Sequence, residues 1–135
     1  SILLKDGSEI PEGIMDAFIT SLCSLHDLKS KKNSKNGSIM IVKPKQHGPE
    51  DCEFTNMIFN KVEEVLGLKK FTIKCGIMDE ERRTSLNLKE CIRKLINRVF
   101  FIRHTLINEY ENIKNTTSLF FKFFLQKKLK TKKNM

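Results

Sequence analysis

Several features that mark common protein classes are missing from this sequence. It has no run of about 18 uncharged apolar residues, which excludes a membrane-spanning helix. Its cysteines form no CxxC pair and no Cys/His cluster, so we expect free thiols at Cys23, Cys52, Cys75 and Cys91 and no structural zinc site. The first residues lack an apolar core followed by a small-residue cleavage site, so we expect no secretory signal.

Motifs for several chemistries are also absent. The sequence holds no GxGxxG, P-loop, nucleophile elbow or HExxH string. It therefore gives no support to a dinucleotide-binding site or a hydrolase triad.

The positive charge is unevenly distributed. The 135 residues carry 25 Lys and Arg against 16 Asp and Glu, a net charge of +9. Residues 103–135 hold eight of these basic residues and two acidic ones, a net charge of +6, which leaves +3 for residues 1–102. Such a modest excess in the larger part does not by itself indicate phosphate or nucleic-acid binding. The length fits one small domain or a piece of a larger one.

Hydrophobic spacing predicts alternating helices and strands. We expect three helices: one over 11–28, one that follows the turn at 47–51 and ends at Gly67, and one over 85–96. In the helix that ends at Gly67, Phe54, Ile58 and Val62 are expected to face inward. Short apolar runs predict strands over 38–43, 71–78 and 99–102, and the polar run 79–85 is expected to be a loop. Strands separated by helical crossovers indicate a parallel α/β sheet of two or three βα units.

Two polar clusters follow predicted strands, where parallel sheets bind ligands. Carboxylates can ligate Mg²⁺, and neighbouring cations can hold an anionic ligand or orient those carboxylates. Taken alone, the acidic and arginine cluster is better explained as a solvated loop of paired Glu and Arg, and the lysine cluster as a strand-ending turn with exposed lysines. The candidate residues are Lys43, Lys45, His47, Asp79, Glu80, Glu81, Arg82 and Arg83.

Several longer strings carry a family resemblance. Residues 37–49 (GSIMIVKPKQHGP), 63–68 (EEVLGL), 76–84 (GIMDEERRT) and 87–92 (NLKECI) closely resemble the malate synthase G family. Residues 12–21 (EGIMDAFITS) and 25–28 (LHDL) fit the family as well. The resemblance covers residues 1–102, and several long motifs in the right order make it specific.

The resemblance implies a partial (β/α)₈ TIM barrel. It also implies an acyltransferase that condenses acetyl-CoA with glyoxylate and hydrolyses the thioester to malate and CoA, with Mg²⁺ as cofactor. Glu80, the first Glu of the Asp-Glu-Glu-Arg-Arg run, is implied as a metal ligand beside glyoxylate. In that family the metal is expected to polarise the aldehyde, and an Asp elsewhere is expected to remove a methyl proton. A monomeric cytoplasmic enzyme of the glyoxylate bypass is implied, with no nucleic-acid or membrane partner.

After residue 102 the sequence departs from the family. The family continues with Asn-Thr-Gly-Phe-Leu-Asp, whose Asp is the second metal ligand, whereas this chain reads Arg-His-Thr-Leu-Ile-Asn and places Asn108 at that position. We therefore expect a truncated or frameshifted fragment that is inactive alone, with a basic, Phe-rich helical tail over 103–135. The alternative is a small basic binding module whose Lys/Phe tail contacts membrane or nucleic acid.

Overall fold

The computed structural model describes residues 2–104, and these residues form helices and short strands. The helices are α1 (Glu12–Ser30), α2 (Pro49–Val65), α3 (Arg82–Leu86) and α4 (Leu88–Lys94). The strands are β1 (Ile2–Leu3), β2 (Glu9–Ile10), β3 (Ile39–Lys43), β4 (Ile73–Asp79) and β5 (Val99–His104).

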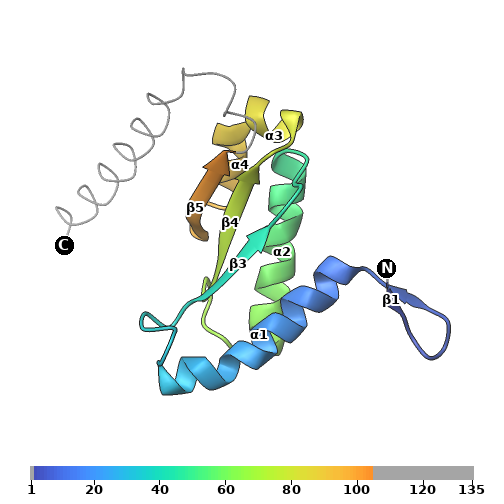
Figure 1. Cartoon of the computed structure of the whole chain (residues 1–135), viewed down its shortest axis with the longest axis vertical. Coiled ribbons are helices and arrows are strands. Elements are labelled where there is room, and N and C mark those ends of the chain that lie inside the picture. The colour runs from blue at the N-terminus through green and yellow to red at the C-terminus, as the bar shows by residue number, and fades with distance from the viewer. Residues whose placement is uncertain (1, 105–135) are drawn as a thin grey trace. The chain divides into compact units, whose positions relative to one another are not determined.

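The central element is a three-stranded parallel sheet in the order β3-β4-β5. Helix α2 connects β3 to β4, and α3 and α4 connect β4 to β5 (Figure 1). In the sheet, each of these strands lies beside the next one along the chain. Sequential parallel strands joined by helices are the repeating unit of a (β/α)₈ barrel. The predicted parallel α/β sheet is confirmed, and within residues 2–104 it is an open sheet of three strands.

The hydrophobic core lies between the sheet and α2. Figure 1 shows α2 running along one face of the three strands. Val62 on α2 and Ile73 and Ile77 on β4 are completely buried. The alternate positions of β3 are more open, since Met40 is 60% exposed and Val42 is 44% exposed. Because successive side chains of a strand point to opposite faces, the sheet has one covered and one open apolar face.

A buried ion pair ties α2 to the residues that precede β4 and β5. Arg98 donates from Nη1 to Glu63 Oε1 at 2.8 Å and from Nη2 to Glu63 Oε2 at 2.9 Å. The backbone amides of Phe71 and Ile73 also donate to this carboxylate, at 3.1 and 2.8 Å. Asn60 and Asn56, about one and two turns before Glu63 on α2, accept from Nη2 and Nε of Arg98, and the Ile73 carbonyl accepts from Nη1. Every strong donor of Arg98 therefore has a partner, as a buried charge requires.

Three thiols belong to the same core. Cys52, Cys75 and Cys91 are fully buried, whereas Cys23 is exposed on α1, and all four are free, as predicted. Burial raises the pKa of the Cys75 thiol to about 12, and it raises the pKa values of Cys52 and Cys91 as well. These buried thiols stay protonated at neutral pH and act as small apolar side chains.

Local sequence patterns missed three details. β1 and β2 pair as a short antiparallel hairpin that we had not predicted. The expected loop 79–85 contains α3, because Thr84 and Ser85 find tertiary partners described below. The expected inward stripe of α2 was wrong in part, since Phe54 is 54% exposed. The buried face of α2 includes the polar Thr55 and Glu63, whose hydrogen bonds to distant residues make their burial possible.

The predicted helical tail lies almost wholly outside the described residues. β5 continues through His104, two residues past the boundary expected at 102. Among the helices of residues 2–104, none combines the length and apolar character needed to cross a membrane.

Candidate functional site

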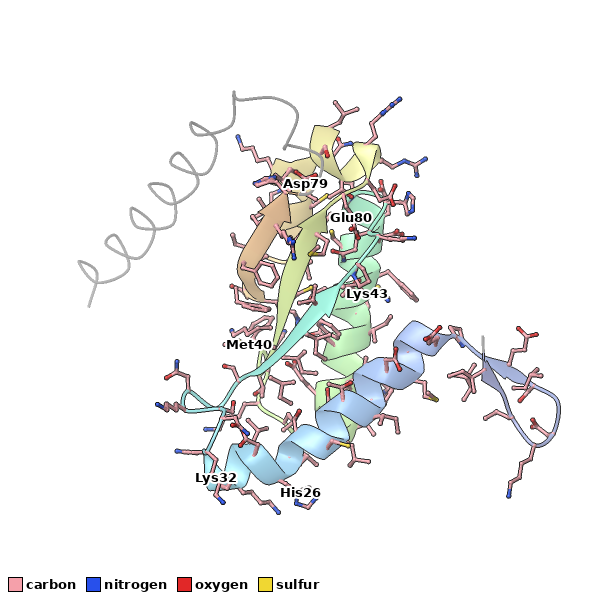
Figure 2. All side chains as sticks on the ribbon, viewed as in Figure 1. His26, Lys32, Met40, Lys43, Asp79 and Glu80 are labelled. Atoms are coloured by element: carbon pink, nitrogen blue, oxygen red, sulfur yellow. The ribbon has the colours of Figure 1, made fainter. Side chains whose placement is uncertain are left out.

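The carboxyl ends of the parallel strands bring the two predicted polar clusters to one edge of the sheet. Figure 2 shows Asp79 and Glu80 at the end of β4, with Lys43 at the end of the neighbouring β3. His26 and Lys32 lie at the far end of α1. A hollow of about 530 Å³, lined by Asp27, Ser34 and Met40 among others, adjoins the amino end of β3. Ligands of parallel sheets bind at the carboxyl edge, so this hollow is not the candidate site.

Glu80 is fixed by the loop that follows β3. Its Oε1 accepts a hydrogen bond from the backbone N–H of Lys45 at 2.7 Å. Lys45 has a left-handed backbone, with φ of 49°, which is uncommon for a residue with a side chain. A charge-assisted bond from a backbone amide orients the Glu80 carboxylate without placing a second charge beside it.

A buried threonine holds the two loops of the site together. Thr84, at the third position of α3, donates from its hydroxyl to the Gln46 carbonyl and accepts from the Gly48 N–H at 3.0 Å. The Gln46 side chain is buried in turn and donates from Nε2 to Thr55 Oγ1 on α2 at 3.1 Å. Lys45 therefore belongs to a loop anchored to both α2 and α3, which keeps its amide aimed at Glu80.

Glu81 and His47 face each other across the same two loops. His47 Nδ1 lies 3.9 Å from Glu81 Oε2, too far for a hydrogen bond. His47 is more than half exposed and Glu81 less than a third. The two can attract each other only when the imidazole is protonated, and solvent weakens that attraction.

Asp79 occupies a different environment from Glu80 although the two are adjacent in sequence. Its side chain is 3% exposed and lies on the helix-covered side of the sheet. Ser85 donates to its Oδ1 at 2.5 Å, and His104 Nδ1 lies 2.6 Å from its Oδ2. Both carboxylate oxygens of Asp79 are engaged in these contacts, so it does not share a ligand position with Glu80.

His104 is not among the predicted site residues. The available signal was its position: a histidine ends an apolar strand, as Asp79 ends the preceding one. β4 and β5 pair in parallel with Asp79 opposite His104, and paired residues of parallel strands project to the same face. That register could not be read from local patterns.

The predicted basic residues do not converge on Glu80. Arg82 and Arg83 are exposed at the start of α3. The Arg83 stem lies over Gly48, with Cδ 3.1 Å from the position a Cβ would take there. The Lys43 amine lies against the first turn of α1, 2.5 Å from the corresponding point at Gly13. Within residues 2–104, no ion pair joins these side chains to Glu80.

The donor set of the described residues fits part of a magnesium site. Carboxylate oxygens are the ligands Mg²⁺ prefers, and protein sites often use only one or two of them. Glu80 supplies one such group at the expected edge of the sheet. No group of three or more His, Cys, Asp or Glu side chains suited to a metal occurs in the part of the chain described.

Comparisons with known proteins identify relatives of this chain. The family model "Malate synthase, TIM barrel domain" matches residues 1–127. The chain is 55% identical over 104 residues to malate synthase G of Halalkalibacterium halodurans, which covers 75% of this chain and 14% of that protein. It is 55% identical over 103 residues to malate synthase G of Corynebacterium efficiens, and 52% identical over 103 residues to that of Corynebacterium glutamicum. The chain spans 14% of the length of each of these relatives.

Proposed function

Because the chain belongs to the malate synthase family, we propose that residues 2–104 carry one corner of a malate synthase active site. The sheet β3-β4-β5 is a sector of the family's TIM barrel. The reaction of the whole enzyme would be the condensation of acetyl-CoA with glyoxylate, followed by thioester hydrolysis to malate and CoA. We propose a monomeric cytoplasmic enzyme of the glyoxylate bypass with no nucleic-acid or membrane partner.

One observation carries this proposal: the Glu80 carboxylate stands at the carboxyl end of β4 and is aimed by the Lys45 amide at 2.7 Å. Glu80 would hold Mg²⁺ and lie beside glyoxylate. A bound Mg²⁺ would act as a Lewis acid on the aldehyde. These residues position the Glu80 carboxylate before a ligand binds. The Thr84 hydroxyl holds the loop through the Gly48 N–H, and the Lys45 N–H of the same loop donates to Glu80.

The remaining candidate residues have supporting roles in this proposal. Glu81 and His47 form the wall of the site between the two loops. Arg82, Arg83, Lys43 and Lys45 add positive charge around an anionic substrate without touching Glu80 through a side chain. Asp79 stabilises the end of β4 by accepting a hydrogen bond from the Ser85 hydroxyl of α3.

Metal binding by the full chain tests the role of Glu80. Mn²⁺, a paramagnetic ion with ligand preferences similar to those of Mg²⁺, should broaden the amide resonances of Glu80 and Lys45 at millimolar concentration, because one carboxylate makes a weak site. Glu80→Gln should abolish this broadening, whereas Glu81→Gln, the matched change one residue later, should retain it. Equal broadening in both variants would refute the assignment of Glu80.

Activity of the chain alone tests how much of the site is present. We expect no detectable thiol release from acetyl-CoA with glyoxylate and Mg²⁺, because residues 2–104 offer one candidate metal ligand and no general base placed against a methyl group. Turnover above the Glu80→Gln background would show that this chain holds a more complete site than we propose.

A further inference from the structure

The hollow beside the amino end of β3 is a concave feature that the proposed function does not use. It has a volume of about 530 Å³ and is lined by the end of α1, the loop 31–38 and the first residues of β3. Figure 2 shows Lys32 at this end of α1 and Glu80 at the opposite end of the sheet. Because the hollow lies away from the carboxyl ends of the strands, a ligand there would be bound and not converted.

Asp27, in the last turn of α1, fixes the loop that forms one wall of the hollow. Its Oδ1 accepts hydrogen bonds from the Asn33 N–H at 2.9 Å and from the Asn33 side chain at 3.2 Å, and its Oδ2 accepts from the Ser34 N–H at 2.6 Å. The Ser34 hydroxyl donates in turn to the Ser38 carbonyl. Both oxygens of Asp27 are therefore engaged within the loop, and the wall is formed before a ligand binds.

The polar side chains that remain available in the hollow can all donate hydrogen bonds. Lys35, Asn36 and Ser38 belong to its lining. Within residues 2–104, the Lys35 ammonium has no ion-pair partner, and the Asn36 amide and the Ser38 hydroxyl have no hydrogen-bond partner. An ammonium group only donates, and amide and hydroxyl groups donate as well as accept. This set of side chains fits an anion with several acceptor oxygens.

The charge around the hollow is positive. The end of α1 and the loop carry four exposed lysines, which are Lys29, Lys31, Lys32 and Lys35. The Ile39 N–H donates to the Thr72 carbonyl at 3.0 Å, which places the exposed Lys69 and Lys70 at the same edge of the sheet. None of these six lysines forms an ion pair within the described residues. Residues 28–49 contain no Asp or Glu, so this edge attracts anions.

We propose that the hollow binds a small molecule that carries a phosphate group on an apolar or aromatic body. The phosphate oxygens would accept from the Lys35, Asn36 and Ser38 donors, and lysine is a common phosphate-binding residue. Leu28 and Met40 line the same hollow and offer apolar surface to the rest of the ligand. This site goes beyond the proposed function, since it lies at the opposite edge of the sheet from Glu80 and shares no residue with that site.

Titration of the uniformly ¹⁵N-labelled full chain with phenyl phosphate, followed by amide NMR, tests the proposal. Phenyl phosphate should shift the amide resonances of residues 33–39. Inorganic phosphate should shift the same resonances with a dissociation constant about fivefold higher, because it has no apolar body to bury. Lys35→Gln should weaken phenyl phosphate binding about fivefold, because it removes one partly exposed charge contact. Lys89→Gln, an equal change of charge at an exposed position of α4, should leave the affinity unchanged.

Several outcomes would overturn the proposal. These are the absence of shifts at residues 33–39, shifts confined to residues 105–135, equal affinities of Lys35→Gln and Lys89→Gln, and equal affinities for phenyl phosphate and inorganic phosphate. Lys35 is exposed, so its replacement should leave the urea midpoint unchanged. Glu80→Gln should retain phenyl phosphate binding while it abolishes the Mn²⁺ broadening, so this inference and the metal proposal fail separately.

Discussion

Replacing Glu63 by glutamine should strongly destabilise the chain, because it would leave the Arg98 guanidinium buried without a counter-charge. Arg98 is completely buried and Glu63 is 3% exposed, so solvent cannot replace the lost interaction. The carboxylate also accepts from the backbone amides that open β4. The substitution therefore weakens both the ion pair and the start of the central strand.

The expected magnitude follows from burial. Breaking a buried ion pair by removing one partner costs about 3–5 kcal/mol. The neighbouring Glu64 provides a matched control on the same helix, since it pairs with Lys61 at 3.1 Å and both side chains are more than 60% exposed. Glu64→Gln should change the free energy of unfolding by less than about 0.5 kcal/mol.

At acidic pH, the free energies of unfolding of the unmodified chain and of Glu63→Gln should become more similar. Burial tends to raise the pKa of Glu63, but the Arg98 guanidinium and the amides of Ile73 and Phe71 outweigh it and hold the pKa below its usual value. A lowered pKa in the folded state stabilises the protein fully above the unfolded value of about 4.3 and ceases to do so as the pH falls through the folded value. Glutamine does not titrate, so the gap should shrink below about pH 4.

Urea unfolding followed by far-ultraviolet circular dichroism measures these differences. The free energies of unfolding of the three chains would be compared at pH 7 and again in acid. A Glu63→Gln variant as stable as Glu64→Gln at pH 7 would refute the reasoning. A variant that is unfolded at pH 7 while Glu64→Gln remains folded would agree with it.

Three further expectations concern the sheet, the loops and the thiols. Gly76→Ala should lower the free energy of unfolding by about 1–3 kcal/mol, since a Cβ there would lie 2.9 Å from Phe101 Cζ; an unchanged urea midpoint would contradict this close approach. Thr84→Val should cost about 1–3 kcal/mol because the Gly48 N–H loses its acceptor, and Thr84→Ser should recover most of that loss; equal midpoints for the two variants would show that the hydroxyl is dispensable. A thiol reagent at pH 8 should modify the exposed Cys23 first, as followed by mass spectrometry, and early labelling would contradict the burial of Cys52, Cys75 and Cys91.

The family and the order of the elements could be read from the sequence because both depend on local strings. Apolar runs of strand length, separated by helical spacing, indicate parallel βα units without knowledge of any contact. Polar residues directly after two such runs had to meet at one edge, since parallel strands end on the same side. The motif around Glu80 likewise carried its family resemblance within nine consecutive residues.

The roles of adjacent acids were decided by tertiary structure alone. Asp79 and Glu80 carry the same functional group, yet Asp79 contacts Ser85 and His104 beneath the strand end whereas Glu80 contacts Lys45 of another loop. Their partners lie up to 35 residues away in sequence. The same holds for Glu63, whose burial depends on Arg98 and which a hydrophobic pattern would place in solvent. The role of a polar side chain and its contribution to stability depend on its hydrogen-bond and ion-pair partners. Only folding brings those partners together when they are distant in sequence.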